Sequence, residues 1–274
     1  MQPLSIGIMQ GRLLPMIDGR VQSFPRDGWE KEFPLAQKQG FASIELTIEM
    51  ASWEIHPVRS SKGRALLKNL ANEHNITLAG LCCDTVMEHP LTKGGQIAEN
   101  MLFTLLENGA EAGLPMIELP MLGSNSLAKA EDISIFNDLL AKGLEFAADF
   151  GIDILLECDL DGPSLAALMQ RQNHPRLGIN YDMGNSHYFG FEPEDEIPAY
   201  FKYIRNAHVK DTTKAEYSKP LGQGETRLND VFRLLARHNY RGGFILQAAR
   251  QEDDIKAAKE YLEFTQNLID KNFV

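Results

Sequence analysis

The stretch Phe150-Gly151-Ile152-Asp153-Ile154-Leu155-Leu156-Glu157-Cys158 decides the fold of this chain. A glycine closes an amphipathic segment here, and the apolar run that follows has the length and composition of a buried strand. The same junction recurs at Gln39-Gly40-Phe41 and at Ala112-Gly113-Leu114. Glycine accepts the left-handed backbone conformation that commonly ends a helix. The repeat therefore predicts helices that lead directly into strands.

On both sides of this stretch, short apolar runs alternate with longer amphipathic segments. Such alternation is typical of repeated βα units rather than of hairpins. The predicted strands are Leu4–Met9, Ser43–Ile48, Thr77–Cys83, Met116–Leu122, Asp153–Cys158, Leu177–Asp182, Ala207–Asp211 and Gly243–Gln247. The predicted helices are Trp29–Gln39, Ser61–His74, Gln96–Ala112, Asp132–Phe150, Pro163–Arg171, Glu196–Arg205, Asn229–His238 and Asp253–Lys271.

Matched strands and helices predict an α/β protein, a (β/α)8 TIM barrel that forms a single domain over residues 1–274. The length fits, because barrels of about 250 residues routinely form one domain. No Pro/Ser-rich linker or shift in composition divides the chain. An open doubly wound sheet is the alternative, but its first strand is normally followed by a Gly-rich phosphate turn. That position here reads Met9-Gln10-Gly11-Arg12-Leu13, with one glycine.

The composition argues against partners that are held by phosphate or lipid charge. The chain is 43% hydrophobic and has a formal net charge of −11, so we expect no nucleic-acid partner and no attraction to an anionic membrane. Residues Met1–Ser5 include no basic segment followed by an apolar run, which predicts a soluble, cytoplasmic protein. Cys82, Cys83 and Cys158 form no CxxC motif and lie in apolar runs, so we expect reduced core thiols.

Ionisable residues inside barrel strands are informative, because such strands are covered on both faces. Glu157 stands at the carboxyl end of its strand, where barrel enzymes place their chemistry. Side-chain alternation puts Asn180 and Asp182 on one face of the next strand, and the polar face should look inward. The same alternation predicts that His208 and Gln247 point inward from the last two strands.

Four consecutive strands thus present nitrogen or oxygen donors to one rim of the barrel. A single strand-end Asp or His is more often a helix cap or a hydrogen-bonded structural residue. Four at equivalent depth are harder to explain in that way, because each buried polar group without a partner costs about 1–3 kcal/mol. Carboxylate oxygens with one imidazole nitrogen suit one divalent metal ion, and Mn²⁺, Mg²⁺, Co²⁺, Fe²⁺ and Zn²⁺ all stay open.

Four motifs give the chain a resemblance to a known family. They are Leu155-Leu156-Glu157, Tyr181-Asp182-Met183-Gly184-Asn185, Ala207-His208-Val209-Lys210-Asp211 and Pro220-Leu221-Gly222-Gln223-Gly224-Glu225. They resemble signatures of the xylose isomerase-like TIM-barrel superfamily of sugar and sugar-phosphate isomerases and epimerases. The resemblance implies a small-molecule carbohydrate or sugar phosphate as the ligand. It also implies metal ligation by Glu157, Asp182, His208 and the residue at position 247.

Position 247 departs from the family pattern, which has a glutamate there. Gln247 can bind a metal through its amide oxygen but cannot transfer a proton at neutral pH. Two formal negative ligand charges would face the ion instead of three, so we expect a stronger Lewis acid that is bound more weakly. Epimerisation by two bases at 157 and 247 is excluded, whereas one-base isomerisation through a metal-stabilised enediolate is allowed. The candidate catalytic residues are Glu157, as the base, and Lys210.

Strand ends and loops at the same rim supply candidates for substrate binding, although exposed basic residues are usually solvated surface. Glu45 and Glu118 end the second and fourth strands with inward parity, and each is either a further acid or base or part of a rim salt bridge. The candidates for substrate binding are Asn185, His187, Arg250, Glu225, Arg12, Glu45 and Glu118.

Other functions on the same fold stay open. A metal-dependent dehydratase of a cyclic polyol acid would share the single-metal rim. A non-catalytic metal- or sugar-binding protein is a further hypothesis, because Gln247 replaces the usual glutamate. An abasic-site endonuclease would need three zinc ions and many histidine ligands, which fits poorly with seven histidines and a net charge of −11. Barrels of this kind often pair, so a homo-oligomer is compatible with the sequence.

Overall fold

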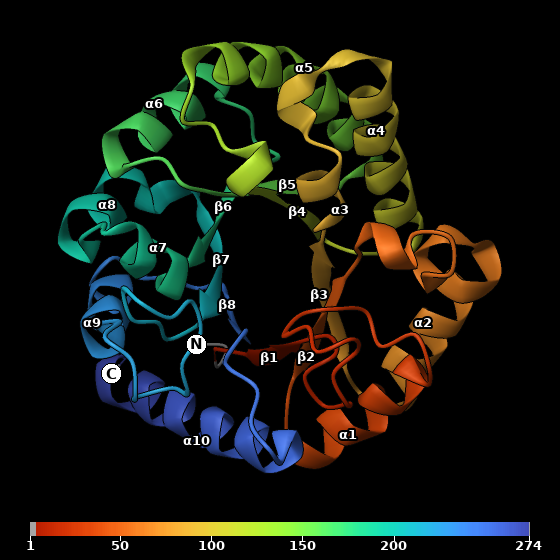
Figure 1. Ribbon diagram of the computed structural model, residues 1–274, viewed down its shortest axis with the longest axis vertical. Helices are drawn as coiled ribbons and strands as arrows, with labels where there is room; N and C mark the ends of the chain where they lie inside the picture. Colours follow the sequence, from red (N-terminus) through yellow and green to blue (C-terminus); the bar gives the residue numbers. More distant parts are fainter. Residues whose placement is uncertain (1–3, 274) are drawn as a thin grey trace.

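Eight short strands pair in parallel and close into a barrel, with β1 bonded to both β2 and β8 (Figure 1). The structure is a computed structural model and describes residues 4–273. Helices cover the outside of the strands and side chains fill the inside, so the strands are buried almost throughout. The strands are β1 Ile6–Met9, β2 Ser43–Thr47, β3 Thr77–Cys82, β4 Met116–Met121, β5 Asp153–Cys158, β6 Leu177–Asp182, β7 Ile204–Val209 and β8 Gly243–Leu246.

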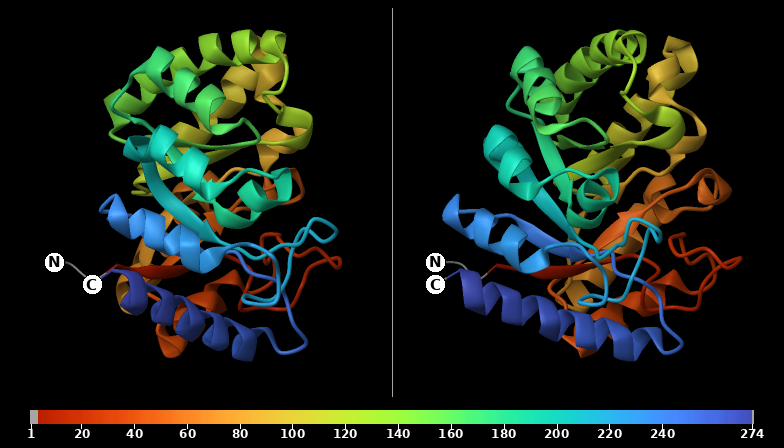
Figure 2. Two further views of the ribbon diagram at one scale, coloured as in Figure 1. Left: turned by 90° about the vertical axis from the view of Figure 1, so that its left-hand side faces the viewer. Right: turned by 60° about the vertical axis from the view of Figure 1, so that its left-hand side comes forward.

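A helical segment follows every strand, which confirms the predicted (β/α)8 barrel. Loops after β1 and β7 lie at one end of the barrel, and the end of α10 lies at the other (Figure 2). Among the helices of residues 4–273, none combines the length and the apolar character that a membrane crossing demands. The helices are α1 Glu32–Gln39, α2 Ser61–Glu73, α3 Thr85–Glu88, α4 Gly95–Glu111, α5 Ala130–Phe150, α6 Gly162–Gln172, α7 Met183–Phe189, α8 Pro193–Tyr200, α9 Leu228–Arg237 and α10 Asp254–Asn272.

The region before β7 differs from the prediction. The sequence pattern predicts a helix over Glu196–Arg205 and a strand over Ala207–Asp211, whereas β7 already begins at Ile204. Arg205 therefore lies in the strand, where its guanidinium pairs with the carboxylate of Asp153 on β5. This ion pair balances the charge of Arg205 near the start of the strand. The pattern also gives no sign of α3 and α7, because such short helices contain too few residues to show a period.

Residues 4–273 form two clusters of buried apolar side chains. The main core lies between strands and helices, where for example Phe244 of β8 stacks on Phe232 of α9 with ring centroids 4.6 Å apart. A second, smaller cluster of Met9, Cys82 and Ile245 is separate from it. All three cysteines are free, as expected. Cys82, however, lines a cavity at the carboxyl ends of the strands instead of joining the main core.

The loop of residues 10–28, between β1 and α1, is fastened to the barrel by two charged side chains. Glu32 accepts hydrogen bonds from the backbone amides of Gly11 at 2.8 Å and Leu13 at 3.1 Å. Arg250, which follows β8, donates to the carbonyl oxygen of Gly11. Burial raises the pKa of Glu32 to about 7. The fastened loop forms one wall of the cavity at the carboxyl ends of the strands.

Candidate metal centre

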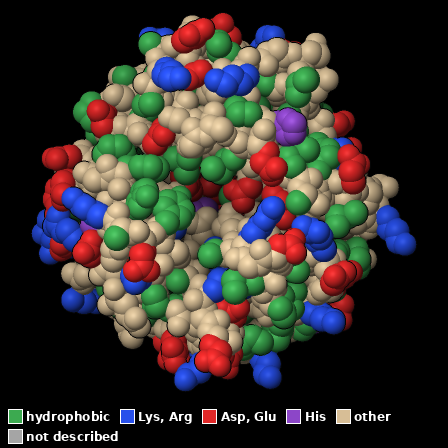
Figure 3. Space-filling view, viewed as in Figure 1, with side chains coloured by type: hydrophobic (Ala, Val, Ile, Leu, Met, Phe, Trp, Pro, Cys, Tyr) green, Lys and Arg blue, Asp and Glu red, His purple; other side chains and the backbone are tan. Residues whose placement is uncertain are grey.

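A cavity of about 740 Å³ opens at the carboxyl ends of the barrel strands. This volume lies in the range of small-molecule binding sites. Figure 3 shows acidic side chains around the central hollow on this face. Predicted site residues that line the cavity are Arg12, Glu118, Glu157, Asn185, Lys210 and Gln247.

Glu157, Asp182 and His208 meet beside this cavity. His208 Nδ1 lies 3.4 Å from Glu157 Oε2 and 3.8 Å from Asp182 Oδ2. Asp182 and His208 are register partners on β6 and β7, so strand pairing itself brings them together. Metal bonds of about 2.0–2.2 Å place two ligands of one ion up to about 4 Å apart, which these distances match.

Several buried atoms of the predicted metal ligands lack hydrogen-bond partners. Among the described residues, His208 Nδ1, Asp182 Oδ2 and Gln247 Oε1 have none. The second oxygen of Asp182 accepts the backbone amide of Asn185 at 2.7 Å and so caps α7. A buried polar atom without a partner is costly. Oxygen and nitrogen donors left open beside a carboxylate therefore fit a divalent cation.

Glu157 is held by two carboxamides. Asn180 Nδ2 donates to Glu157 Oε2 at 2.8 Å, and Asn185 Nδ2 donates to Glu157 Oε1. Asn180 comes from the neighbouring strand β6, and Asn185 comes from α7. Donors on both oxygens stabilise the ionised carboxylate and fix its orientation.

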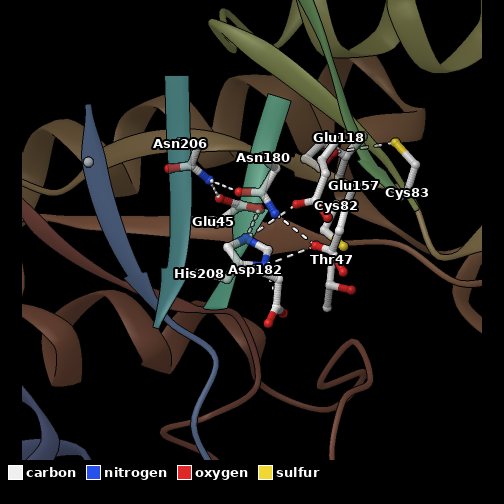
Figure 4. Close-up of polar contacts among 12 residues, drawn as sticks. Glu45, Thr47, Cys82, Cys83, Glu118, Glu157, Asn180, Asp182, Asn206 and His208 are labelled. Atoms are coloured by element: carbon white, nitrogen blue, oxygen red, sulfur yellow. Dashed lines mark hydrogen bonds and ion pairs between the residues drawn. The ribbon is translucent and has the colours of Figure 1, made fainter. Parts of the chain in front are cut away.

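Further carboxylates and amides hold His208 on its other side (Figure 4). His208 Nε2 lies 3.1 Å from Glu45 Oε1 and 3.3 Å from Glu118 Oε2. Asn206 Nδ2 donates to the second oxygen of Glu45 at 2.9 Å. An imidazole that donates Nε2–H to a carboxylate keeps Nδ1 as its ligand atom. Glu45 and Glu118, which the sequence suggests for substrate binding, are thus placed to orient the histidine.

Opposite charges in this cluster strongly perturb each other. Burial alone lowers the pKa of His208, but the charges of Glu45 and Glu157 raise it to about 10. Burial opposes ionisation of Glu157, yet the positive charge of the nearby His208 lowers its pKa to about 2. Burial and the neighbouring glutamates raise the pKa of Glu118 well above its usual range. The excess negative charge can be balanced at Nδ1 by a proton or by a metal cation.

Lys210 joins the rim of this cluster from the end of β7. Its Nζ donates to Asn185 Oδ1 at 2.8 Å and lies 3.9 Å from Asp182 Oδ2. The ammonium group also lies 3.5 Å from the ring centre of Tyr217, which belongs to the loop after β7. Burial lowers the pKa of Lys210. The contacts with Asn185, Asp182 and Tyr217 nevertheless hold this ammonium group at the cavity wall, close to the predicted metal ligands.

Other predicted substrate-binding residues either lie outside this cavity or bind the protein itself. Arg250 binds carbonyl oxygens of the β1 loop and does not line the 740 Å³ cavity. Arg12 lines it, but its guanidinium donates to loop atoms, including Gln22 Oε1 at 3.2 Å. His187 and Glu225 lie 3.8 Å apart outside the lining residues, and the Glu225 side chain is 60% exposed.

Asp84 is a cavity residue that the sequence reasoning missed. Its Oδ2 accepts hydrogen bonds from Gln22 Nε2 at 2.9 Å and Thr47 Oγ1 at 3.2 Å. The rule that identified Glu157, a carboxylate at the end of an apolar strand, applies equally to Asp84 after β3. Gln22 and Tyr217 lie in long loops, where no local pattern marks a residue that reaches into a cavity.

Residues 33–268 match the family model described as xylose isomerase-like TIM barrel. L-ribulose-5-phosphate 3-epimerase UlaE of Escherichia coli is 20% identical over 244 residues, which cover 84% of this chain and 86% of that protein. D-allulose 3-epimerase from Methylomonas sp. has a similar structure, with a TM-score of 0.74, 18% identity and coverage of 97% and 98% of the two chains. D-psicose 3-epimerase from Clostridium cellulolyticum, solved with D-tagatose, gives a TM-score of 0.78 at 14% identity, with coverage of 97% and 99%.

Proposed function

The chain belongs to the xylose isomerase-like TIM-barrel family, and we propose that it is a divalent-metal-dependent isomerase or epimerase of a sugar or sugar phosphate. The name of the relative UlaE supports this reaction class. One observation carries the proposal. Within residues 4–273, His208 Nδ1 and Asp182 Oδ2 are buried without hydrogen-bond partners in a group that also includes the Glu157 carboxylate, and the equally unpartnered Gln247 Oε1 belongs to a residue that lines the same cavity as Glu157.

Glu157 is the proposed base for such a reaction. Asn180 and Asn185 hold its carboxylate in one orientation at the cavity wall. In this role it removes a proton from the carbon next to a substrate carbonyl. The positive charge of Lys210 would stabilise a developing negative oxygen at the same rim. A divalent cation held by Glu157, Asp182, His208 and Gln247 would supply Lewis acidity toward the carbonyl.

Gln247 limits the reactions that this site can catalyse, because a carboxamide cannot act as a second base at that position. Its backbone amide donates to the Val209 carbonyl at 3.2 Å, so the side chain starts from the end of β8, next to the residue that precedes Lys210 on β7. We propose that its unpartnered Oε1 is the fourth ligand atom. Return of that proton by Glu157 to the neighbouring carbon, on the same face, with the hydroxyl proton passing between the two adjacent oxygens, would give a ketose–aldose isomerisation.

Metal analysis followed by solvent isotope exchange tests the proposal. Elemental analysis of the purified protein should find about one divalent ion per chain. NMR in D₂O should then detect deuterium at a carbon next to the carbonyl in a member of a panel of pentoses, hexoses and their phosphates. A chelator should abolish the exchange, and added metal should restore it.

Three results would contradict the proposed reaction in different ways. Bound metal without isotope uptake from any sugar would favour the non-catalytic binding protein. Loss of water from a cyclic polyol acid would favour the dehydratase. Isotope exchange that survives complete removal of metal would disprove the metal dependence.

A further inference from the structure

We propose that the cavity is built for an unphosphorylated sugar and discriminates against the phosphorylated form. This inference rests on the proposed function and narrows its substrate class. Barrels of this fold commonly bind phosphate at the loops after the seventh and eighth strands, where backbone amides and basic side chains converge. In this chain, the amides of Gly222, Gly224 and Thr226 after β7 and the guanidinium of Arg250 after β8 are bound to the protein itself.

The loop after β7 turns its amides onto an internal carboxylate. Asp211 Oδ2 accepts the backbone amides of Gly222 at 2.9 Å and Gly224 at 3.0 Å. Its Oδ1 accepts the amides of Thr226 at 3.1 Å and Thr212 at 3.0 Å. A Cβ atom at Gly224 would lie 2.1 Å from Asp211 Oδ1, so the loop is wrapped closely around this group. Concave sets of amides bind anions, and here the anion is Asp211.

The loop after β1 has a second set of amides that is occupied by an internal carboxyl group. Both carboxylate oxygens of Glu32 lie 2.8 Å from the amide nitrogen of Gly11, and one lies 3.1 Å from that of Leu13. Gly11 has a φ of +89°, a conformation that turns its amide toward Glu32 and that other residues rarely adopt. The amides of Gly11 and Leu13 are therefore also unavailable to an external phosphate.

The basic side chains near the rim are engaged as well. Arg250, in the loop after β8, donates to two carbonyl oxygens of the β1 loop. Arg12 donates to a backbone carbonyl and a side-chain oxygen of that same loop. Lys210 donates to Asn185 at 2.8 Å. Among the described residues that line the cavity, this leaves Arg20 as the remaining basic side chain, and Arg20 is exposed.

Carboxylates outnumber the basic side chains on the cavity wall. Glu49, Asp84, Glu88 and Glu216 all line it, apart from the predicted metal ligands. Within the described part of the chain, Glu49 Oε1 is buried without a hydrogen-bond partner. Sugar hydroxyls can donate to such oxygens. A phosphate group carries about −1.5 to −2 charge at neutral pH and consists mainly of acceptors, so these carboxylates repel it.

Matched pairs of substrates test this inference on the full-length, metal-loaded protein. L-ribulose is compared with L-ribulose 5-phosphate, and D-allulose with D-allulose 6-phosphate, by deuterium uptake from D₂O. We expect kcat/KM to be higher for each free sugar, by about tenfold or more. Inorganic phosphate should neither inhibit the exchange nor raise the melting temperature. Equal or higher kcat/KM for the phosphorylated partner would overturn the inference.

A binding measurement separates failure of this inference from failure of the proposed function. If no sugar takes up deuterium, the proposed reaction is wrong, and calorimetric titration with the same pairs still tests the preference. Tighter binding of the free sugar would support the inference. Tighter binding of the phosphorylated partner, or no binding of either, would overturn it.

A charge variant at the rim gives a second measurement. Glu88 is exposed beside the cavity, and Glu88→Gln removes one negative charge from its wall. We expect the preference for the free sugar, expressed as the ratio of the two kcat/KM values, to fall by about twofold or more. Glu107→Gln, the same change at an exposed position of α4, should leave the ratio unchanged. An unchanged ratio in Glu88→Gln would count against charge as the source of the preference.

Discussion

His208 Nε2 lies 3.1 Å from Glu45 Oε1, although 163 residues separate them in the chain. This contact faces away from Glu157 and Asp182, which lie on the Nδ1 side of the ring. A carboxylate behind a histidine fixes the ring orientation and makes the opposite nitrogen a better metal ligand. The two glutamates therefore have different positions relative to the histidine. Glu45 contacts Nε2 and orients the ring, whereas Glu157 lies beside Nδ1, the predicted ligand atom.

Glu45→Gln should weaken metal binding. The carboxamide no longer draws the Nε2 proton by charge, and its single oxygen replaces two acceptors, of which one Glu45 oxygen pairs with His208 and the other accepts from Asn206. We expect metal affinity to fall by about 10- to 100-fold, measured by competition with a chromogenic chelator. Glu107→Gln on the surface of α4 is the matched control. Unchanged affinity in a folded Glu45→Gln protein would show that Glu45 does not support the ligand.

Glu157→Gln should abolish the proposed chemistry. The substitution keeps the shape of the side chain but removes the group that accepts the proton. We expect deuterium uptake by substrate to fall by about 10²- to 10⁴-fold at saturating metal. Metal affinity should also fall, because one negative ligand is lost. Glu145→Gln, at an exposed position of α5, should retain both properties. Near-normal isotope exchange in Glu157→Gln would assign the base elsewhere.

Gln247→Glu should bind metal more tightly than the natural chain. It adds a negative charge at an atom that has no hydrogen-bond partner among the described residues, on a residue that lines the same cavity as Glu157. Titration with Mn²⁺ followed by electron paramagnetic resonance measures the change, which we expect to be about tenfold or more. The variant would also regain a group capable of proton transfer. If the affinity does not rise, Gln247 does not contribute a ligand atom.

Glu32 should make the stability of the protein depend on pH. Burial raises its pKa from 4.5 to about 7, so between these values the folded protein retains a proton that the unfolded chain releases. The contribution is complete below about pH 4.5 and is lost as the pH rises through about 7, which lowers the free energy of unfolding by about 2–4 kcal/mol. Urea unfolding of the natural chain and of Glu32→Gln, at pH values between about 5 and 8, measures it.

The difference in unfolding free energy between the natural chain and Glu32→Gln separates the effect of Glu32 from that of other groups that titrate in the same pH range. Glu32→Gln should show a smaller loss of stability with rising pH, while Glu145→Gln should follow the natural chain. Parallel curves for the natural chain and Glu32→Gln would show that the carboxyl ionises at the same pH in both folded and unfolded states.

Strand parity and strand ends were readable from the sequence because both are local properties. Side chains alternate between the two faces of a strand, so Asp182 and His208 could be assigned to the inner face before any pairing was known. Each also stands near a carboxyl end, and all such ends of a parallel barrel meet at one rim. The helix-closing glycines, including Gly151, marked the repeat that distinguishes this barrel from an array of hairpins.

Tertiary structure alone decided the tasks of the remaining polar residues. The register of β2 and β4 relative to β7 brings Glu45 and Glu118 to the Nε2 side of His208, and register around a closed barrel depends on packing of the whole ring. Loop paths have no period, so nothing in the sequence marked Gln22 as a partner of Asp84. For the same reason Arg250 looked like a ligand for substrate, whereas long-range packing directs it onto the backbone of the β1 loop.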